Sequence, residues 1–132
     1  MGRREIREQI FKILFRIEFN EMEEMPEQLR LFFEQEEAIE EKEQAEIEAK
    51  YEKIAGKLEI IDGMLKEKAD KWSLNRMGKV ELTLLRLAVY EMEFDEDIPV
   101  SVAINEAVEL AKKFGQDESP AFINGVLAKF TK

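Results

Sequence analysis

The sequence contains no cysteine and no histidine. These absences exclude disulfides, thiolate or imidazole metal ligands and nucleophile–histidine dyads, and they leave carboxylates as the remaining candidates for acid–base catalysis. Long apolar runs are also missing, and Lys12 and Arg16 interrupt the first apolar stretch. We therefore expect neither a signal peptide nor a membrane contact, and we predict a cytoplasmic protein without a cofactor.

Proline and glycine are scarce, with three and six residues among 132, and alternating β-branched residues, which are typical of strands, do not occur. Hydrophobic residues make up 45% of the chain and charged residues 38%. This composition is typical of a helical globular protein, and the length suits one domain. We expect a single domain over residues 1–132, with an N-terminal sub-bundle over about 1–75 and a C-terminal sub-bundle over about 76–132.

The formal net charge of −10 conceals an asymmetry along the chain. Residues 1–16 carry five basic and two acidic side chains, whereas residues 17–52 carry three basic and fourteen acidic ones. The low isoelectric point therefore says little about what the amino terminus binds. The acidic stretch is interpreted as the solvated face of a helix, which would also repel polyanions.

An amphipathic helix is predicted over about 4–19, with Arg3, Arg4 and Arg7 forming one basic corner on its first two turns. Phe11, Phe15 and Phe19 form a second stripe at a spacing of four. We interpret the phenylalanine stripe as core. For Phe15, a place in the core and a place on a partner-binding surface remain equally open.

Further helices are predicted by periodicity and by end signals. Pro26 begins a short helix, and an acidic helix follows that lies on the bundle surface and is interrupted near Gly56. Gly63 and Gly78 then bracket a segment that contains Trp72, the only tryptophan.

The segment 79–94 is apolar nearly all round, which predicts a central buried helix. Arg86 lies in its middle and is expected to pair with a carboxylate, because a buried unpaired guanidinium would be too costly. The next helix begins near Pro99, exposes an apolar stripe to the core, and ends at Gly115. The predicted stripe comprises Val100, Ile104, Ala107, Ala111 and Phe114.

Ser119 and Pro120 are interpreted as the N-cap and first residue of a last helix. Gly125 lies inside that helix although glycine is a poor helix former. We therefore expect close backbone packing at this position.

Three stretches together resemble the NusB family of bacterial transcription antitermination factors. They are the opening "RREIREQIFKILF", the middle "KWSLNRMGKVELTLLRLAVYEM" and the long ungapped "IPVSVAINEAVELAKKFGQDESPAFINGVLAKF". The resemblance implies an all-α, NusB-like fold of about seven helices in two roughly perpendicular sub-bundles. It also implies a factor, not an enzyme, that binds boxA RNA together with NusE, a small-subunit ribosomal protein, and joins the RNA polymerase antitermination complex indirectly.

The resemblance also implies site residues. Arg3, Arg4 and Arg7 correspond to the arginine-rich RNA-binding motif, while Phe15 and Glu81 correspond to positions on the NusE-binding surface. Clustered guanidinium groups at a helix N-terminus suit phosphates. Phe122 is the candidate ring for base stacking, although a core contact with Phe114 is an equal alternative. The implied RNA-binding residues on the C-terminal half are Lys113, Glu118, Ser119 and Phe122.

Two other functions remain open at this point. A protein-only helical interaction module, or a homodimer without its own RNA-binding role, would use the surface around Phe15 and Glu81. A carboxylate-dependent metalloenzyme is disfavoured, because the spacing of the acidic residues forces no pair together. No catalytic residue and no metal ligand is assigned.

Overall fold

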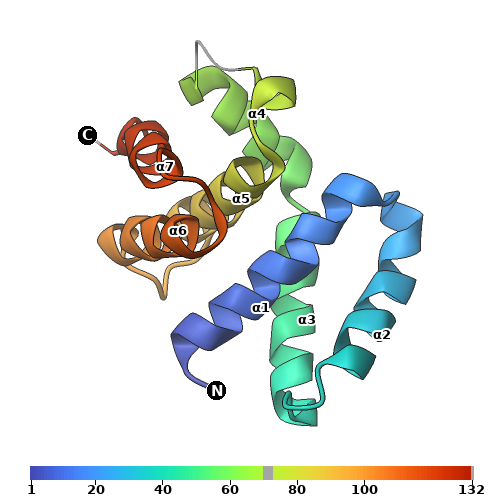
Figure 1. Cartoon of the computed structure of the whole chain (residues 1–132). Coiled ribbons are helices and arrows are strands. Elements are labelled where there is room, and N and C mark those ends of the chain that lie inside the picture. The colour runs from blue at the N-terminus through green and yellow to red at the C-terminus, as the bar shows by residue number, and fades with distance from the viewer. Residues whose placement is uncertain (70–72, 132) are drawn as a thin grey trace. The chain divides into compact units, whose positions relative to one another are not determined.

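The computed structural model describes residues 1–69 and 73–131, and within these ranges every regular element is helical (Figure 1). Seven α-helices and three short 3₁₀ turns are found in this part of the chain, which confirms the predicted all-α class. The chain forms two compact units, Met1–Gly56 and Lys57–Lys132. The sequence predicts a boundary near residue 75, whereas the second unit begins at Lys57, because helix Leu58–Ala69 packs on Lys79–Phe94.

The first unit is built on helix α1 (Arg3–Phe15), which packs on both α2 (Met25–Gln35) and α3 (Glu41–Ala55) (Figure 1). Two 3₁₀ turns, Arg16–Phe19 and Met22–Glu24, join α1 to α2. The core of this unit consists of Ile10, Phe11, Ile13, Leu14, Met25, Leu29, Phe32, Ile39, Ile47, Tyr51 and Ile54.

The phenylalanine stripe of α1 is not wholly core. Phe11 is buried and Phe15 is half-buried, but Phe19 is 61% exposed, so the prediction of a continuous buried stripe is wrong at its last ring. The α-helix ends at Phe15, and the following turn is 3₁₀ with about three residues per turn. A spacing of four therefore no longer keeps Phe19 on the buried face.

Helix α3 confirms the predicted acidic helix and its interruption at Gly56, which is the C-cap. Its glutamates are mostly exposed, but Ile47, Tyr51 and Ile54 are at most 2% exposed. A narrow apolar stripe thus anchors the helix firmly, because these three side chains recur at the helical period. Burial raises the pKa of Tyr51 to about 12.

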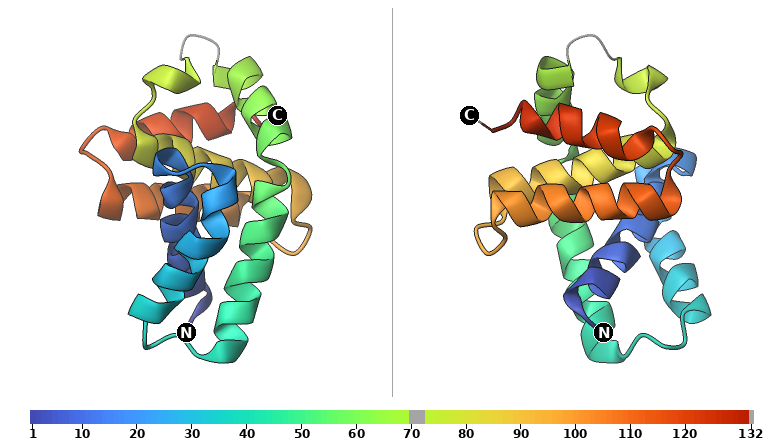
Figure 2. Two further views of the ribbon diagram at one scale, coloured as in Figure 1. Left: turned by 90° about the vertical axis from the view of Figure 1, so that its right-hand side faces the viewer. Right: turned by 60° about the vertical axis from the view of Figure 1, so that its left-hand side comes forward.

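The second unit contains α4 (Leu58–Ala69), a 3₁₀ turn (Leu74–Arg76), α5 (Lys79–Phe94), α6 (Val100–Phe114) and α7 (Ser119–Ala128). Helices α5, α6 and α7 contact one another pairwise, and they run side by side in Figure 2, right. Because two helices and α4 pack around α5, nearly all of its faces are covered, as predicted.

Arg86 has the carboxylate partner that its burial requires. Its Nε donates to Oδ1 of Asp62 and its second terminal nitrogen donates to Oδ2, each at 2.9 Å. The arginine side chain is 13% exposed and the aspartate 29%. This two-pronged ion pair joins α5 to α4 and confirms the prediction.

Gly63 does not bracket a segment, because it lies inside α4. Trp72, which the sequence placed in that segment, lies outside the described residues.

The buried face of α6 is also rotated from the predicted stripe. Val100 is 40% exposed, whereas Ala103 and Leu110 are buried beside the correctly predicted Ala107 and Ala111. The shift arises because α6 is covered by two neighbours, α5 and α7, instead of by one.

The expectation of close packing at Gly125 is likewise wrong. A Cβ atom built at this glycine would find nothing within 4 Å.

Candidate nucleic-acid interface

The candidate RNA-binding residues form two groups, one on each unit. Arg3, Arg4 and Arg7 begin α1, where the first two are exposed and the third is half-buried. The second group lies where α6 ends and α7 begins. It comprises Lys113, Glu118, Ser119 and Phe122.

The glutamates that interrupt the arginine cluster have local structural roles. Gly2, in an extended conformation, precedes α1 as its N-cap, and its N–H donates to Glu5 Oε1 at 3.2 Å. Glu8 pairs with Lys12 one turn later at 3.5 Å. The helix N-terminus that carries the arginines is therefore well formed, with the positive end of its dipole at the cluster.

The same helix end is tied to α3. The ammonium group of Met1 donates to Glu43 Oε2 at 2.7 Å. This hydrogen bond raises the pKa of the amine, and it lowers the pKa of Glu43. Met1, which precedes the arginine cluster, is thus hydrogen-bonded to α3, which holds the first turn of α1 against that helix.

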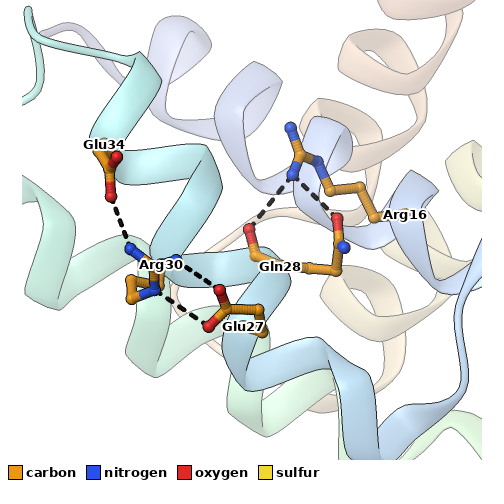
Figure 3. Close-up of polar contacts among 5 residues, drawn as sticks. All are labelled: Arg16, Glu27, Gln28, Arg30 and Glu34. Atoms are coloured by element: carbon orange, nitrogen blue, oxygen red, sulfur yellow. Dashed lines mark hydrogen bonds and ion pairs between the residues drawn. The ribbon is translucent and has the colours of Figure 1, made fainter.

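Two other arginines of the first unit are engaged within the protein (Figure 3). Arg16 donates to the backbone oxygen and to Oε1 of Gln28, at 3.2 and 3.0 Å. Arg30 pairs with Glu27 and Glu34 on either side of it along α2, which raises the pKa of the guanidinium and lowers that of Glu27. These contacts organise α2 and its attachment to the turn after α1.

On the second unit, α6 ends at Gly115 as predicted, but not because of a left-handed backbone. The φ angle of Gly115 is −97°, which any residue can adopt. A Cβ atom at this position would lie 2.7 Å from Ser119 Cβ and 2.8 Å from the Ala111 carbonyl oxygen. Glycine is therefore required for space, because the α6–α7 turn passes directly over it. Lys113, the last residue but one of α6, is exposed, with Nζ 5.4 Å from the centroid of the Phe114 ring.

Ser119 is the first residue of α7 and not its N-cap, since Glu118 occupies the N-cap position. Its side chain is 3% exposed. The Ser119 hydroxyl accepts a hydrogen bond from the Gln116 N–H at 2.9 Å and donates to Glu81 Oε2. A buried hydroxyl with two internal partners is placed to shape the turn, whereas Glu118 beside it is exposed.

Phe122 lies one turn into α7 and is half-buried. The next residue, Ile123, is completely buried and anchors the helix. Phe122 is therefore partly exposed, while the buried Ile123 holds the helix that carries it.

The candidate partner-binding residues again belong to different units. Phe15 is half-buried, and its ring lies 6.0 Å from that of Phe11 and 5.1 Å from that of Phe19 between centroids. Glu81 is the third residue of α5 and is half-buried.

Sequence reasoning missed two features of these surfaces. Phe19 and the 48% exposed Met22 add exposed apolar area after Phe15. The polar residues on either side of them in the sequence were the available indication that this segment is exposed. The contact between Glu81 and Ser119 spans 38 residues, and no local sequence pattern indicates it.

Among the residues that the structure describes, no helix has the length and apolar character needed to cross a membrane.

Comparison with known proteins places this geometry in a family. The profile of the NusB family matches residues 4–132. Transcription antitermination protein NusB of Lachnoclostridium phytofermentans is 50% identical over 129 residues, which is 98% of either chain. That of Agathobacter rectalis is 49% identical over 98% of this chain and 99% of its own.

Solved structures show the same fold. The T. maritima NusB structure superposes with a TM-score of 0.85 at 36% identity, covering 98% of this chain and 89% of that one. A chain in the crystal structure of a plectonemic RNA supercoil matches with a TM-score of 0.81 at 24% identity, which supports the fold alone. By the match along nearly its whole length and by its helical fold, this chain belongs to the NusB family.

Proposed function

We propose that the chain is a cytoplasmic, non-enzymatic transcription antitermination factor that binds boxA-type RNA together with NusE during ribosomal RNA transcription. It would join the RNA polymerase antitermination complex through these two partners. The names of its relatives support the role in antitermination. The observation that carries the RNA-binding part is the arginine cluster on an ordered, capped helix start in an otherwise acidic protein.

Phosphates are the ligand that this helix start suits best. Arg3 and Arg4 are exposed, and each guanidinium offers several donors to a phosphate. The dipole of α1 adds positive potential at the same end. We assign Arg3, Arg4 and Arg7 to contacts with the RNA backbone, which are independent of base sequence.

Bases are the ligand proposed for the start of α7. The half-buried Phe122 presents part of a ring for stacking, and the exposed Lys113 supplies a charge for a neighbouring phosphate. The exposed Glu118 lies between them along the chain, and its negative charge would oppose approaching phosphates and so hold the RNA affinity down. Phe15 and Glu81 are assigned to the protein partner.

The test is an RNA titration over a range of salt concentrations, with and without NusE. Each phosphate contact with single-stranded RNA adds about 0.7 to the slope of log affinity against log salt. We expect changing Arg3, Arg4 and Arg7 together to alanine to lower this slope by about 2 and to leave NusE binding unchanged.

The matched control replaces three exposed lysines elsewhere, Lys42, Lys53 and Lys66, with alanine. This control removes the same charge, so a nonspecific charge effect would change both slopes equally. Equal slopes for the two triple variants would overturn the assignment of the arginines.

A protein-only interaction module or homodimer is the second candidate, and the exposure of Phe19 and Met22 favours it. These two side chains and Phe15 present apolar area of the kind found at protein interfaces. Binding of NusE, or self-association in sedimentation experiments, without any RNA-dependent signal would select this function over the first.

A further inference from the structure

The turn between α6 and α7 is held by a hydrogen-bonded chain that begins on α5. The Gln116 N–H donates to Ser119 Oγ at 2.9 Å, and the Ser119 hydroxyl donates to Glu81 Oε2. Ser119 is 3% exposed, so the hydroxyl at the middle of this network is shielded from water, although Glu81 is half-buried and Gln116 is exposed. A hydrogen bond to a carboxylate in such a place is stronger than one between neutral groups.

Two glycines, Gly78 and Gly115, leave the space that the Glu81 and Ser119 side chains of this hydrogen-bonded network occupy. A Cβ atom at Gly78 would collide with the Glu81 carboxylate, which folds back over the start of α5. A Cβ atom at Gly115 would lie 2.7 Å from both Cβ and Oγ of Ser119. The carboxylate and the hydroxyl thus occupy space that a side chain at either glycine would fill.

We infer that Glu81 is a positioning residue, which fixes the Gln116–Ser119 turn through the Ser119 hydroxyl and so sets the geometry of the surface formed by Lys113, Glu118 and Phe122. The link to RNA rests on the function proposed above. Glu81 thereby influences RNA binding in the absence of any protein partner. Ser119 acts through the same hydrogen bonds and need not touch the RNA.

The choice of substitution separates positioning from charge. Glu81→Gln keeps an oxygen that accepts the Ser119 hydroxyl but removes the negative charge, whereas Glu81→Ala removes both. Positioning predicts RNA affinity close to that of the unchanged protein for Glu81→Gln, and a loss of about threefold to tenfold for Glu81→Ala. If the carboxylate acted only by repelling phosphates, both variants would bind RNA more tightly and by similar factors.

A double-variant cycle tests whether Glu81 and Ser119 act together. Ser119→Ala should weaken RNA binding about as much as Glu81→Ala, and the two changes combined should cost no more than the larger single effect. The matched control is Glu67→Ala, which removes an exposed carboxylate from α4. Affinity for a boxA-like oligonucleotide is measured without NusE, well below each variant's melting temperature.

Amide hydrogen exchange at Gln116 provides a readout that does not depend on RNA. Exchange at this N–H should accelerate in Ser119→Ala and in Glu81→Ala, but not in Glu81→Gln or Glu67→Ala. If the unchanged protein bound no RNA, the proposed function would fail while the exchange data still tested the positioning. If RNA bound normally and Glu81→Ala matched Glu67→Ala in affinity and exchange, the inference would be overturned.

Discussion

Two glycines of the second unit look alike in the sequence and differ in the structure. Gly115 has an ordinary φ of −97° but no room for a Cβ atom, whereas Gly125 has open space around it inside α7. At the first position glycine is required by packing. At the second it only adds conformational freedom to the unfolded chain.

Gly125→Ala should therefore stabilise the protein, by about 0.5–1 kcal/mol, because alanine is the better helix former. Gly115→Ala should destabilise it by about 1–3 kcal/mol, since the new methyl group overpacks the turn against Ser119. Urea unfolding of both variants measures the difference. Changes of the same sign at both positions would contradict the assignment of open and filled space.

The sequence predicts some single contacts and not others, and the reason is energetic. Arg86 could be assigned a carboxylate partner in advance, because a buried unpaired guanidinium is too costly. Its identity as Asp62, 24 residues earlier, depends on how α4 packs on α5. The contact of Glu81 with Ser119 could not be foreseen, because neither residue alone demands the other.

At the scale of elements, periodicity predicts helices better than it predicts their buried faces. All of the predicted helices are present, because a repeat of 3.6 residues persists along each of them. The faces of α1 and α6 are misjudged at Phe19 and Val100. There the local conformation changes to 3₁₀, or a second neighbour covers the helix, and neither event is encoded in a single repeat.

Helix α3 gives a pH-dependent prediction through Tyr51. The ordinary tyrosine pKa of 10.0 applies to the unfolded chain, and burial raises it to about 12 in the folded protein. Between these values the unfolded state loses the proton and the folded state keeps it. The free energy of unfolding should thus fall as pH rises from 10 to 12, by at most about 1.4 kcal/mol per pH unit.

Tyr51→Phe should make this alkaline loss of stability shallower, as measured by urea unfolding at a series of pH values. The difference in tyrosinate absorbance between the two proteins gives the titration of Tyr51 itself. A midpoint near pH 10 for that difference would show that the ring is accessible to solvent.

At the scale of the whole molecule, acidity is unevenly shared. The unit Met1–Gly56 has nine basic and sixteen acidic residues, whereas Lys57–Lys132 has eleven and fourteen. Like charges on the first unit repel one another, and salt screens this repulsion. The arginine cluster is therefore a local exception on the more acidic of the two units.

Raising monovalent salt from about 10 to 150 mM should increase the melting temperature by a few degrees, since the Debye length shortens to about 8 Å. Replacing the exposed Glu23, Glu37 and Glu48 with lysine should weaken this dependence, because the net charge becomes less negative. Differential scanning calorimetry of both proteins provides the comparison. A melting temperature that falls with salt would mean that attractive ion pairs outweigh the repulsion.

The fold as a whole could be predicted largely because its sequence signals agree. Scarce glycine and proline, helical periodicity and three family-like stretches all indicate the same all-α class. For the candidate site, the sequence proposes a set of residues, but it does not indicate which of their side chains are buried and which are exposed. The burial of Ser119 depends on three helices meeting, a property of the packed unit that no single segment carries.

The space shared by Gly78, Glu81, Gly115 and Ser119 also constrains how the sequence can evolve. A side chain larger than hydrogen at either glycine meets the carboxylate or the serine, so the first step away from any one of them is penalised while the others stay. Substitutions at these four positions should therefore be correlated among related sequences. Relatives that lack a hydroxyl at the position of Ser119 are expected to lack the acid at the position of Glu81 as well. They should also carry larger residues at the positions of the two glycines.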